Sequence, residues 1–282
     1  MSGRPAAAEL EAGGRLGPYR LEEILGEGGM GIVFKAVREP DGEVVALKVL
    51  RAELSGDETY RRRFEREGRL AAGLAHPHLV PVLDAGEADG HPYLATSYVV
   101  GLTLADLLET SGPLPLSAVL RCSSEIATGL DTLHQEGLVH RDVKPANILI
   151  DESGSSFLTD FGLAKGVAAT VLTEPGRVVG TLDYLAPEVI KGSPAGPPAD
   201  IYALGCVVYE CICGRPPFAG GGFTDATLAI LEEEPGDPCA GRNDLPPGLS
   251  LAVVQALAKA PADRPPTATA YALMLRISAR PS

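Results

Sequence analysis

The chain has 282 residues, of which 45% are hydrophobic, so it can form one large domain or two modest ones around a sizeable core. Its formal net charge of -13 excludes a general field that would attract nucleic acid or an anionic membrane. Five cysteines without regular spacing favour a reducing compartment, and no apolar run reaches the ~18 residues that span a bilayer. We therefore expect a cytoplasmic globular protein with no membrane segment in this chain.

Acidic residues stand near the N-terminus where a signal peptide would need an apolar run, so residues 1–18 are expected to form a flexible tail. The next part of the chain contains β-branched runs separated by turns. These predict five strands, at residues 19–26, 31–37, 43–50, 79–87 and 92–99. Residues 55–74 break this pattern with the capping box Ser55-x-x-Glu58 and a helical period of apolar residues. One helix is therefore predicted within a β-rich segment.

After Gly101 the pattern changes to long helical stretches divided by proline and glycine clusters. The predicted helices are 104–111, 116–136, 198–213, 223–233, 249–259 and 267–277. A small β-rich lobe is therefore expected to precede a larger helical lobe. This arrangement belongs to the α+β fold class.

The stretch "LGEGGMGIV" contains three glycines, Gly26, Gly28 and Gly31, at a spacing that brings backbone against phosphate. The same spacing occurs in dinucleotide-binding folds, where a helix follows the glycines, and in hairpins that cover ATP. Here "GIVFKAV" continues as a strand, and Lys48 occupies the region where a dinucleotide-binding fold needs an acid. The sequence therefore favours a hairpin that covers ATP over a dinucleotide-binding fold.

Three further motifs follow in order: "HRDVKPAN" at 140–147, "DFG" at 160–162 and "APE" at 186–188. With these motifs the chain resembles the eukaryotic-type serine/threonine protein kinases, and "YRLEEILGEGGMG" is most similar to their bacterial branch. The resemblance implies the bilobal protein-kinase fold. Its parts would be a kinase domain at 19–278, with the N-lobe at 19–96, the hinge at 97–100 and the C-lobe at 101–278.

The resemblance also implies catalytic roles. Asp142 would accept or orient the proton of the substrate hydroxyl, and Lys144 would neutralise the transferred phosphoryl group. Lys48 would hold the α- and β-phosphates and be positioned by Glu67 of the inserted helix. Glu65 is the rival of Glu67, but it lies about 200° around a helix of 3.6 residues per turn, so only one of them can face the strand.

Two cofactors are implied, ATP and Mg²⁺, with Mn²⁺ as an alternative metal. Asn147 and Asp160 would be the metal ligands, since hard oxygen donors suit these ions. The three glycines would cover the phosphates. The positions that match the adenine and hinge contacts of the family are Leu25, Val33, Ala46, Ser97, Val99 and Leu149.

The implied substrates are proteins that carry serine or threonine, with no nucleic acid partner. Thr103 and Ala146 occupy positions where arginine-directed kinases carry acids, so no capture of a basic residue upstream of the phosphoacceptor is expected. A non-catalytic nucleotide-binding scaffold is the competing class, but Lys48, Asp142 and Asp160 are all present. Zinc binding at Cys211-x-Cys213 is disfavoured because residues i and i+2 of a helix point apart.

The segment between "DFG" and "APE" offers Thr170 and Thr173 as targets for autophosphorylation. Thr173 is favoured, since its spacing to Gly180 is similar to that of the phosphorylated threonine in related bacterial kinases. Arg141 and Lys165 would supply cations for the phosphate. Modification of one molecule by another would require a transient contact between two kinase molecules.

Overall fold

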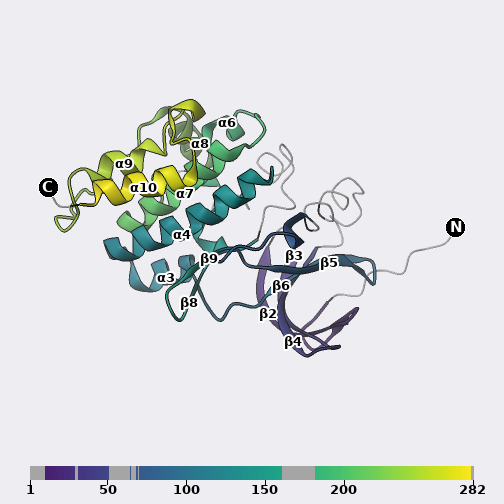
Figure 1. The fold of residues 1–282 in the computed structure, drawn as a ribbon. Coiled ribbons are helices and arrows are strands. Elements are labelled where there is room, and N and C mark those ends of the chain that lie inside the picture. Colours follow the sequence, from purple (N-terminus) through teal and green to yellow (C-terminus); the bar gives the residue numbers. More distant parts are fainter. Residues whose placement is uncertain are drawn as a thin grey trace. The chain divides into compact units, whose positions relative to one another are not determined.

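The computed structural model describes residues 10–28, 31–50, 64, 68, 70–160, 182–220 and 222–280. These residues divide into two units. One comprises Met1–His76 and Val80–Val99, and the other comprises Pro77–Leu79 and Val100–Ser282. We refer to them as the sheet unit and the helical unit (Figure 1).

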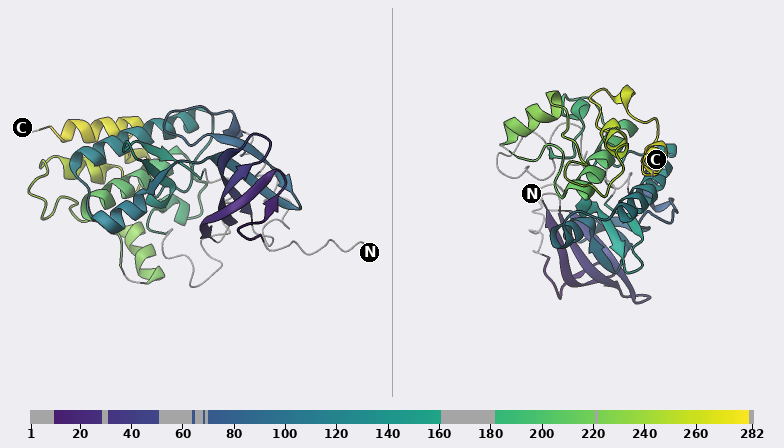
Figure 2. Two further views of the ribbon diagram at one scale, coloured as in Figure 1. Left: turned by 90° about the horizontal axis from the view of Figure 1, so that it is seen from below. Right: turned by 90° about the vertical axis from the view of Figure 1, so that its left-hand side faces the viewer.

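The sheet unit is a six-stranded sheet with strand order β1-β2-β3-β4-β6-β5, and every neighbouring pair is antiparallel. Figure 2 shows these strands as a strongly twisted sheet. The strands are β1 (Arg15–Leu16), β2 (Tyr19–Gly28), β3 (Gly31–Arg38), β4 (Glu43–Leu50), β5 (Val82–Ala88) and β6 (His91–Ser97). In β4 the alternate residues Val45, Leu47 and Val49 are buried in the core of this unit. Period-two alternation thus decides which face of the strand is covered.

The prediction that residues 1–18 form a flexible tail is wrong for the last part of this segment. Arg15 and Leu16 form β1 and pair with Arg20 and Tyr19 of β2. Leu16 is fully buried in the sheet core, and this burial stabilises a strand too short to produce a sequence signal. Residues 1–9 lie outside the described residues.

The inserted helix is described only at a few positions. Phe64, Gly68 and the segment 70–72 are helical, and Phe64 and Ala71 are buried. Glu65 and Glu67 lie outside the described residues. The predicted strand at 79–87 begins later, at Val82, since Leu79 instead forms a single parallel bridge with Leu158 of the helical unit.

The helical unit contains the predicted helices, mostly within two residues of the expected ends. They are α3 (Leu104–Ser111), α4 (Leu116–Gln135), α7 (Pro197–Cys213), α8 (Phe223–Glu232), α9 (Leu249–Gln255) and α10 (Ala268–Ser278). Short additional elements are the helix α6 (Pro187–Ile190), the 3₁₀ turns η1 (Pro145–Asn147) and η2 (Pro261–Asp263), and a three-stranded sheet of β7 (Gly101–Thr103), β8 (Ile148–Asp151) and β9 (Ser156–Leu158). Helix α9 ends before the predicted residue 259. The carbonyl groups of Ala258 and Lys259 instead accept hydrogen bonds from the Arg264 guanidinium.

Helix α7 forms the centre of the helical unit because it is apolar around its whole circumference. It packs against α4, α9 and α10 (Figure 1). At Gly205 a Cβ atom would lie 2.8 Å from the Cβ of Ala256, so glycine permits α7 and the chain after α9 to approach closely.

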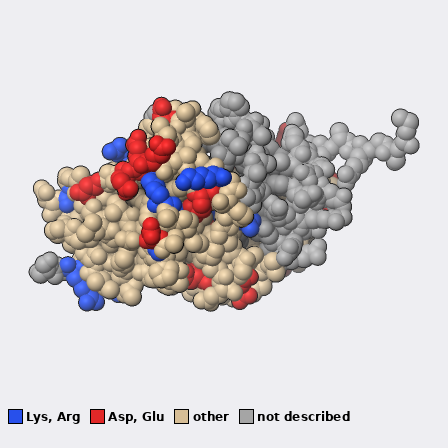
Figure 3. All heavy atoms as spheres, turned by 90° about the horizontal axis from the view of Figure 1, so that it is seen from above, with Lys and Arg blue, Asp and Glu red and all other residues tan. Residues whose placement is uncertain are grey.

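In the part of the chain that the structure describes, no helix is long and apolar enough to cross a membrane. All five cysteines are free thiols. On the face shown in Figure 3, acidic and basic side chains of the described residues are interspersed, and neither sign forms a continuous patch.

A buried ion pair joins three parts of the helical unit. The Arg264 guanidinium donates to both carboxylate oxygens of Glu188 in α6, at 2.7 Å each, and to the carbonyl of Pro198 in α7 at 2.9 Å. The same guanidinium lies 4.9 Å from the ring centroid of Tyr202. The Arg264 side chain is fully buried and that of Glu188 is 16% exposed, so neither charge can recover hydration if its partner is lost.

We predict that Arg264→Met lowers the free energy of unfolding by about 3–5 kcal/mol, because it leaves a largely buried carboxylate unpaired. Urea denaturation of the 282-residue chain measures the change. Arg276→Met, at an exposed arginine of α10, is the control and should change stability by less than about 0.5 kcal/mol. Equal losses in the two variants would contradict this assignment.

Candidate active site

The glycine motif lies in a hairpin of the sheet unit. Gly28 at the end of β2 pairs with Gly31 at the start of β3, and Gly26 pairs with Val33. No helix follows the glycines, which excludes the dinucleotide reading. A Cβ at Gly31 would lie 2.2 Å from the carbonyl oxygen of Val49, whereas one at Gly26 or Gly28 would meet no atom of the described residues within 4 Å. Gly31 is therefore required by the β3–β4 packing, and the other two glycines leave their surroundings open for a ligand.

Three of the predicted nucleotide contacts, Val33, Ala46 and Lys48, share one face of the sheet. Val33 pairs directly with Lys48 across β3 and β4, so their side chains share a face. Ala46 lies two residues before Lys48, on the same face and opposite the buried core of the unit. Leu25 lies at a register shift in β2 and is 42% exposed, and Ser97 ends β6. Val99 is the last residue of this unit, and Leu149 lies in β8 of the helical unit.

In the helical unit the loop from His140 to Asn147 is anchored by Asp200 of α7. The backbone N–H groups of His140 and Arg141 donate to its two carboxylate oxygens, each at 2.8 Å, and His134 Nε2 lies 2.8 Å from Oδ2. Asp200 is only 1% exposed, so this carboxylate depends on these donors. Arg141 has a left-handed backbone with φ of 64°, which is a costly conformation. The hydrogen bonds from the His140 and Arg141 N–H groups to Asp200 stabilise it.

This loop brings Asp142, Lys144 and Asn147 together. Lys144 Nζ donates to Asp142 Oδ2 at 3.0 Å, and Asn147 Nδ2 donates to the same oxygen at 3.1 Å and to the Asp142 carbonyl at 2.8 Å. Asn147 is buried in the 3₁₀ turn η1, which connects Lys144 to the start of β8. The arrangement fixes the orientation of one carboxylate beside one cation.

His140 connects the loop to the segment that ends at Asp160. Its Nε2 lies 3.0 Å from the Thr159 carbonyl, and the Asp142 N–H donates to its Nδ1 at 3.3 Å. Because a carbonyl only accepts and an N–H only donates, His140 is the neutral tautomer with the proton on Nε2. Burial lowers the pKa of His140 below its ordinary 6.5 and favours the same neutral form. Asp160 follows with a φ of 61°.

The side-chain oxygens of Asn147 and Asp160 are ligands suited to a divalent cation that phosphate oxygens also coordinate. The amide nitrogen of Asn147 is engaged by Asp142, which directs its Oδ1 to the other side. No cluster of three or more His, Cys, Asp or Glu side chains suited to a metal occurs among the described residues. A phosphate-bridging ion needs only one or two protein ligands, so the pair Asn147 and Asp160 fits such an ion.

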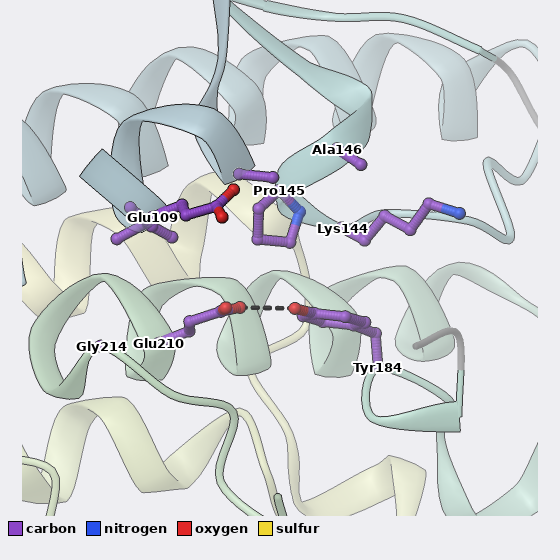
Figure 4. Close-up of a pocket in the computed structure, with 9 residues that line it drawn as sticks. Glu109, Lys144, Pro145, Ala146, Tyr184, Glu210 and Gly214 are labelled. Atoms are coloured by element: carbon purple, nitrogen blue, oxygen red, sulfur yellow. Dashed lines mark hydrogen bonds between the residues drawn. The ribbon is translucent and has the colours of Figure 1, made fainter. Parts of the chain in front are cut away.

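Sequence reasoning did not identify several polar residues around the loop. His134 gave no signal because it occupies an ordinary position of an amphipathic helix. Glu109 and Glu210 line a pocket beside Lys144 (Figure 4), but they come from α3 and α7 and form no local motif. Only the tertiary structure brings these residues to the loop.

Comparison with known proteins gives one consistent result. Residues 19–270 match the sequence profile of the protein kinase domain. The chain is 40% identical over 257 residues to the serine/threonine-protein kinase PknE of Mycobacterium tuberculosis, covering 91% of this chain and 45% of that protein. It is 39% identical over 258 residues to PknH of Mycobacterium bovis, covering 92% of this chain and 43% of that protein. The chain thus spans less than half the length of these relatives.

Solved structures give the same match. The crystal structure of the PknI kinase domain of Mycobacterium tuberculosis is similar with a TM-score of 0.77 and 33% sequence identity. The similarity covers 96% of this chain and 100% of that one.

We predict that His140 stays neutral at pH values where ordinary histidines have become charged. Its lowered pKa means that, just below pH 6.5, the unfolded chain binds a proton that the folded chain does not. Its contribution to stability is therefore complete above pH 6.5 and declines as the pH falls below that value. An NMR titration of the imidazole nitrogens, assigned with His140→Gln, should show the neutral Nε2–H tautomer at pH 6. A doubly protonated ring at that pH would overturn the assignment.

Proposed function

Because the chain belongs to the protein kinase domain family, we propose that it transfers the γ-phosphoryl group of ATP to serine and threonine hydroxyls of proteins. The observation that carries the proposal is the Asp142 carboxylate, which Lys144 and Asn147 hold in one orientation. In the reaction, the substrate hydroxyl oxygen bonds to the γ-phosphorus, the bond to the β–γ bridging oxygen breaks, and ADP leaves.

Each residue in the helical unit has a defined task in this proposal. Asp142 orients the substrate hydroxyl and accepts its proton. Lys144 is already within hydrogen-bond distance of Asp142, so it can neutralise charge that develops on the phosphoryl group without moving far. Asn147 and Asp160 would hold Mg²⁺, with Mn²⁺ as the alternative, and a bound ion would neutralise phosphate charge.

The sheet unit supplies the nucleotide contacts. Lys48 would hold the α- and β-phosphates, with Glu67, outside the described residues, as its partner. The open backbone at Gly26 and Gly28 supports close approach of phosphates. Val33 and Ala46 lie on the same sheet face as Lys48, which supports their role as apolar contacts of the adenine. The remaining residues proposed to contact the nucleotide are Leu25, Gly31, Ser97 and Val99 of this unit and Leu149 of the helical unit.

We place the reaction in the cytoplasm, where ATP is available. Five free cysteines agree with a reducing compartment. A role in signalling follows from the reaction, since a phosphate adds about -1.5 to -2 charges to a protein surface.

We predict that Asp142→Asn lowers the rate of phosphoryl transfer by at least about 10²-fold, because it removes the general base. The asparagine preserves the size of the side chain, so the fold and nucleotide binding should persist. Transfer is measured with Mg²⁺ATP, and nucleotide binding by the rise in melting temperature. The matched control is Asp263→Asn, at an exposed position of η2. Near-wild-type turnover in Asp142→Asn would exclude the assignment, and nucleotide binding without transfer in the wild type would indicate a scaffold.

We further predict that the active protein carries a phosphate on Thr173, with Thr170 as the second choice, and that one molecule modifies another. Both threonines lie outside the described residues. Arg141 precedes Asp142 directly, so a phosphate bound to Arg141 would couple this segment to the catalytic loop. Mass spectrometry of residues 167–177 should find the phosphate in the wild type and not in Asp142→Asn. Full activity of Thr173→Ala would contradict the activating role.

A further inference from the structure

Lys35 is a cation on the same sheet face as the proposed adenine contacts. It lies in β3 and pairs directly with Ala46 of β4, so the two side chains share a face. Val33, two residues earlier in β3, points to that face as well, whereas the intervening Phe34 is buried in the core. Lys35 therefore lies beside two proposed contacts of the base, although no sequence motif singled it out.

The ammonium group of Lys35 lies over the aromatic ring of Tyr98, with 5.3 Å between Nζ and the ring centroid. A cation within about 6 Å of an aromatic face is attracted by the negative potential of that face. Both residues are half-buried and both belong to the sheet unit, so water screens this attraction less than it would at a fully exposed pair. The contact ties the chain after β6 to β3, across the intervening β4.

Tyr98 is the first residue after the end of β6. The sheet holds the chain as far as Ser97, whose backbone N–H donates to the Pro81 carbonyl at 3.0 Å. Residues 98–100 then have no regular secondary structure. No strand ladder fixes the backbone of this segment, so side-chain contacts such as that of Tyr98 with Lys35 contribute to its conformation.

Two peptide groups meet at the Cα of Tyr98. One contains the carbonyl of Ser97, and the other contains the N–H of Val99. Because each peptide group is planar, rotation about the two backbone bonds of Tyr98 sets the directions of both groups. Ser97 and Val99 are the proposed hinge contacts, and backbone C=O and N–H groups are obligatory hydrogen-bonding groups that can match the edge of a base. An anchored Tyr98 ring therefore restricts the two groups that would receive adenine.

Lys35 lies away from the glycine hairpin proposed to cover the phosphates. It stands four residues after Gly31 in β3, and a strand rises ~3.3 Å per residue, so the two Cα atoms are about 13 Å apart. The ammonium group is directed to Tyr98. Lys35 is thus separate in position from Lys48, which is proposed to hold the phosphates.

We propose that Lys35 and Tyr98 form a positioning pair for the adenine base. The ammonium of Lys35 holds the Tyr98 ring against the sheet, and the ring in turn holds the backbone of Ser97 and Val99 in the conformation that binds the base. Neither side chain touches the reacting atoms, so the pair affects nucleotide affinity and not the rate of phosphoryl transfer. This assignment rests on the proposed kinase function.

Displacement of a fluorescently labelled ADP tests the pair. The competitors are ADP, adenosine and inorganic tripolyphosphate, each with Mg²⁺, because adenosine carries the base without phosphates and tripolyphosphate carries phosphates without the base. A cation–π contact at a partly exposed site corresponds to roughly 2- to 5-fold in affinity. We expect Lys35→Met to weaken ADP and adenosine by about this factor and to leave tripolyphosphate unchanged.

Further variants separate the contact from general effects. Tyr98→Leu should cause the same losses, and the double variant with Lys35→Met should be no weaker than either single one, because a single contact is lost in all three. Lys35→Arg and Tyr98→Phe keep a cation and a ring, so both should bind as the wild type does. Arg20→Met, at an exposed arginine of β2, is the matched charge control and should change none of the three affinities.

Steady-state kinetics give a second readout. In Lys35→Met the KM for ATP should rise by about the same factor while kcat stays unchanged, since the lost interaction is made equally in the ground state and the transition state. A fall in kcat at constant KM would contradict a role at the base.

The outcomes distinguish this pair from the kinase function. If tripolyphosphate weakens together with ADP in Lys35→Met, the lysine acts as a charge for phosphates and the pair is overturned. If the wild type binds ADP and Lys35→Met binds ADP and adenosine equally well, the pair is overturned and the kinase function stands. A wild type that binds neither ADP nor adenosine contradicts the kinase function, and the pair with it.

Discussion

One buried carboxylate, that of Asp200, holds the loop from His140 to Asn147 in its conformation. Asp200 lies within the apolar helix α7, where an ionised group is costly unless donors surround it. The backbone N–H groups of His140 and Arg141 provide those donors, and His134 adds a third. The benefit is mutual, because these hydrogen bonds also offset the cost of the left-handed backbone at Arg141.

The same constraint extends away from the loop through packing. Helix α7 packs against α4, α9 and α10, and Arg264, which directly follows η2, joins the N-terminal end of α7 to α6 through its bonds to the Pro198 carbonyl and to Glu188. In α4, Asp131 accepts hydrogen bonds from the backbone N–H groups of Ala268 and Thr269 and so caps α10. These contacts give the loop a rigid support, so the position of Asp142 relative to the core is determined by side chains distant from it in sequence.

Three carboxylates of the helical unit illustrate how surroundings determine a role. Asp200 is satisfied by backbone and imidazole donors, so it serves as an anchor. Asp142 is oriented by a lysine and an amide beside the place where the reaction is proposed to occur. Glu210 accepts a hydrogen bond from the Tyr184 phenol and borders a pocket, so a neutral donor rather than a cation contacts it among the described residues. The residue types are nearly the same, and the difference lies in the donors that the fold brings to each of them.

Sequence alone determined the element order, the glycine hairpin and the identity of the loop residues, since these depend on local signals: alternation, turn residues and fixed spacing. It missed β1, because two residues carry no periodicity and only burial of Leu16 in the sheet core stabilises that strand. The sequence predicted Asp142 and Asn147 as site residues but not the hydrogen bond between them. It gave no indication that Glu109 and Glu210 lie beside Lys144. Those relations were decided by the tertiary structure, because α3 and α7 are far apart in the chain and meet at the loop only through the packing of the helical unit.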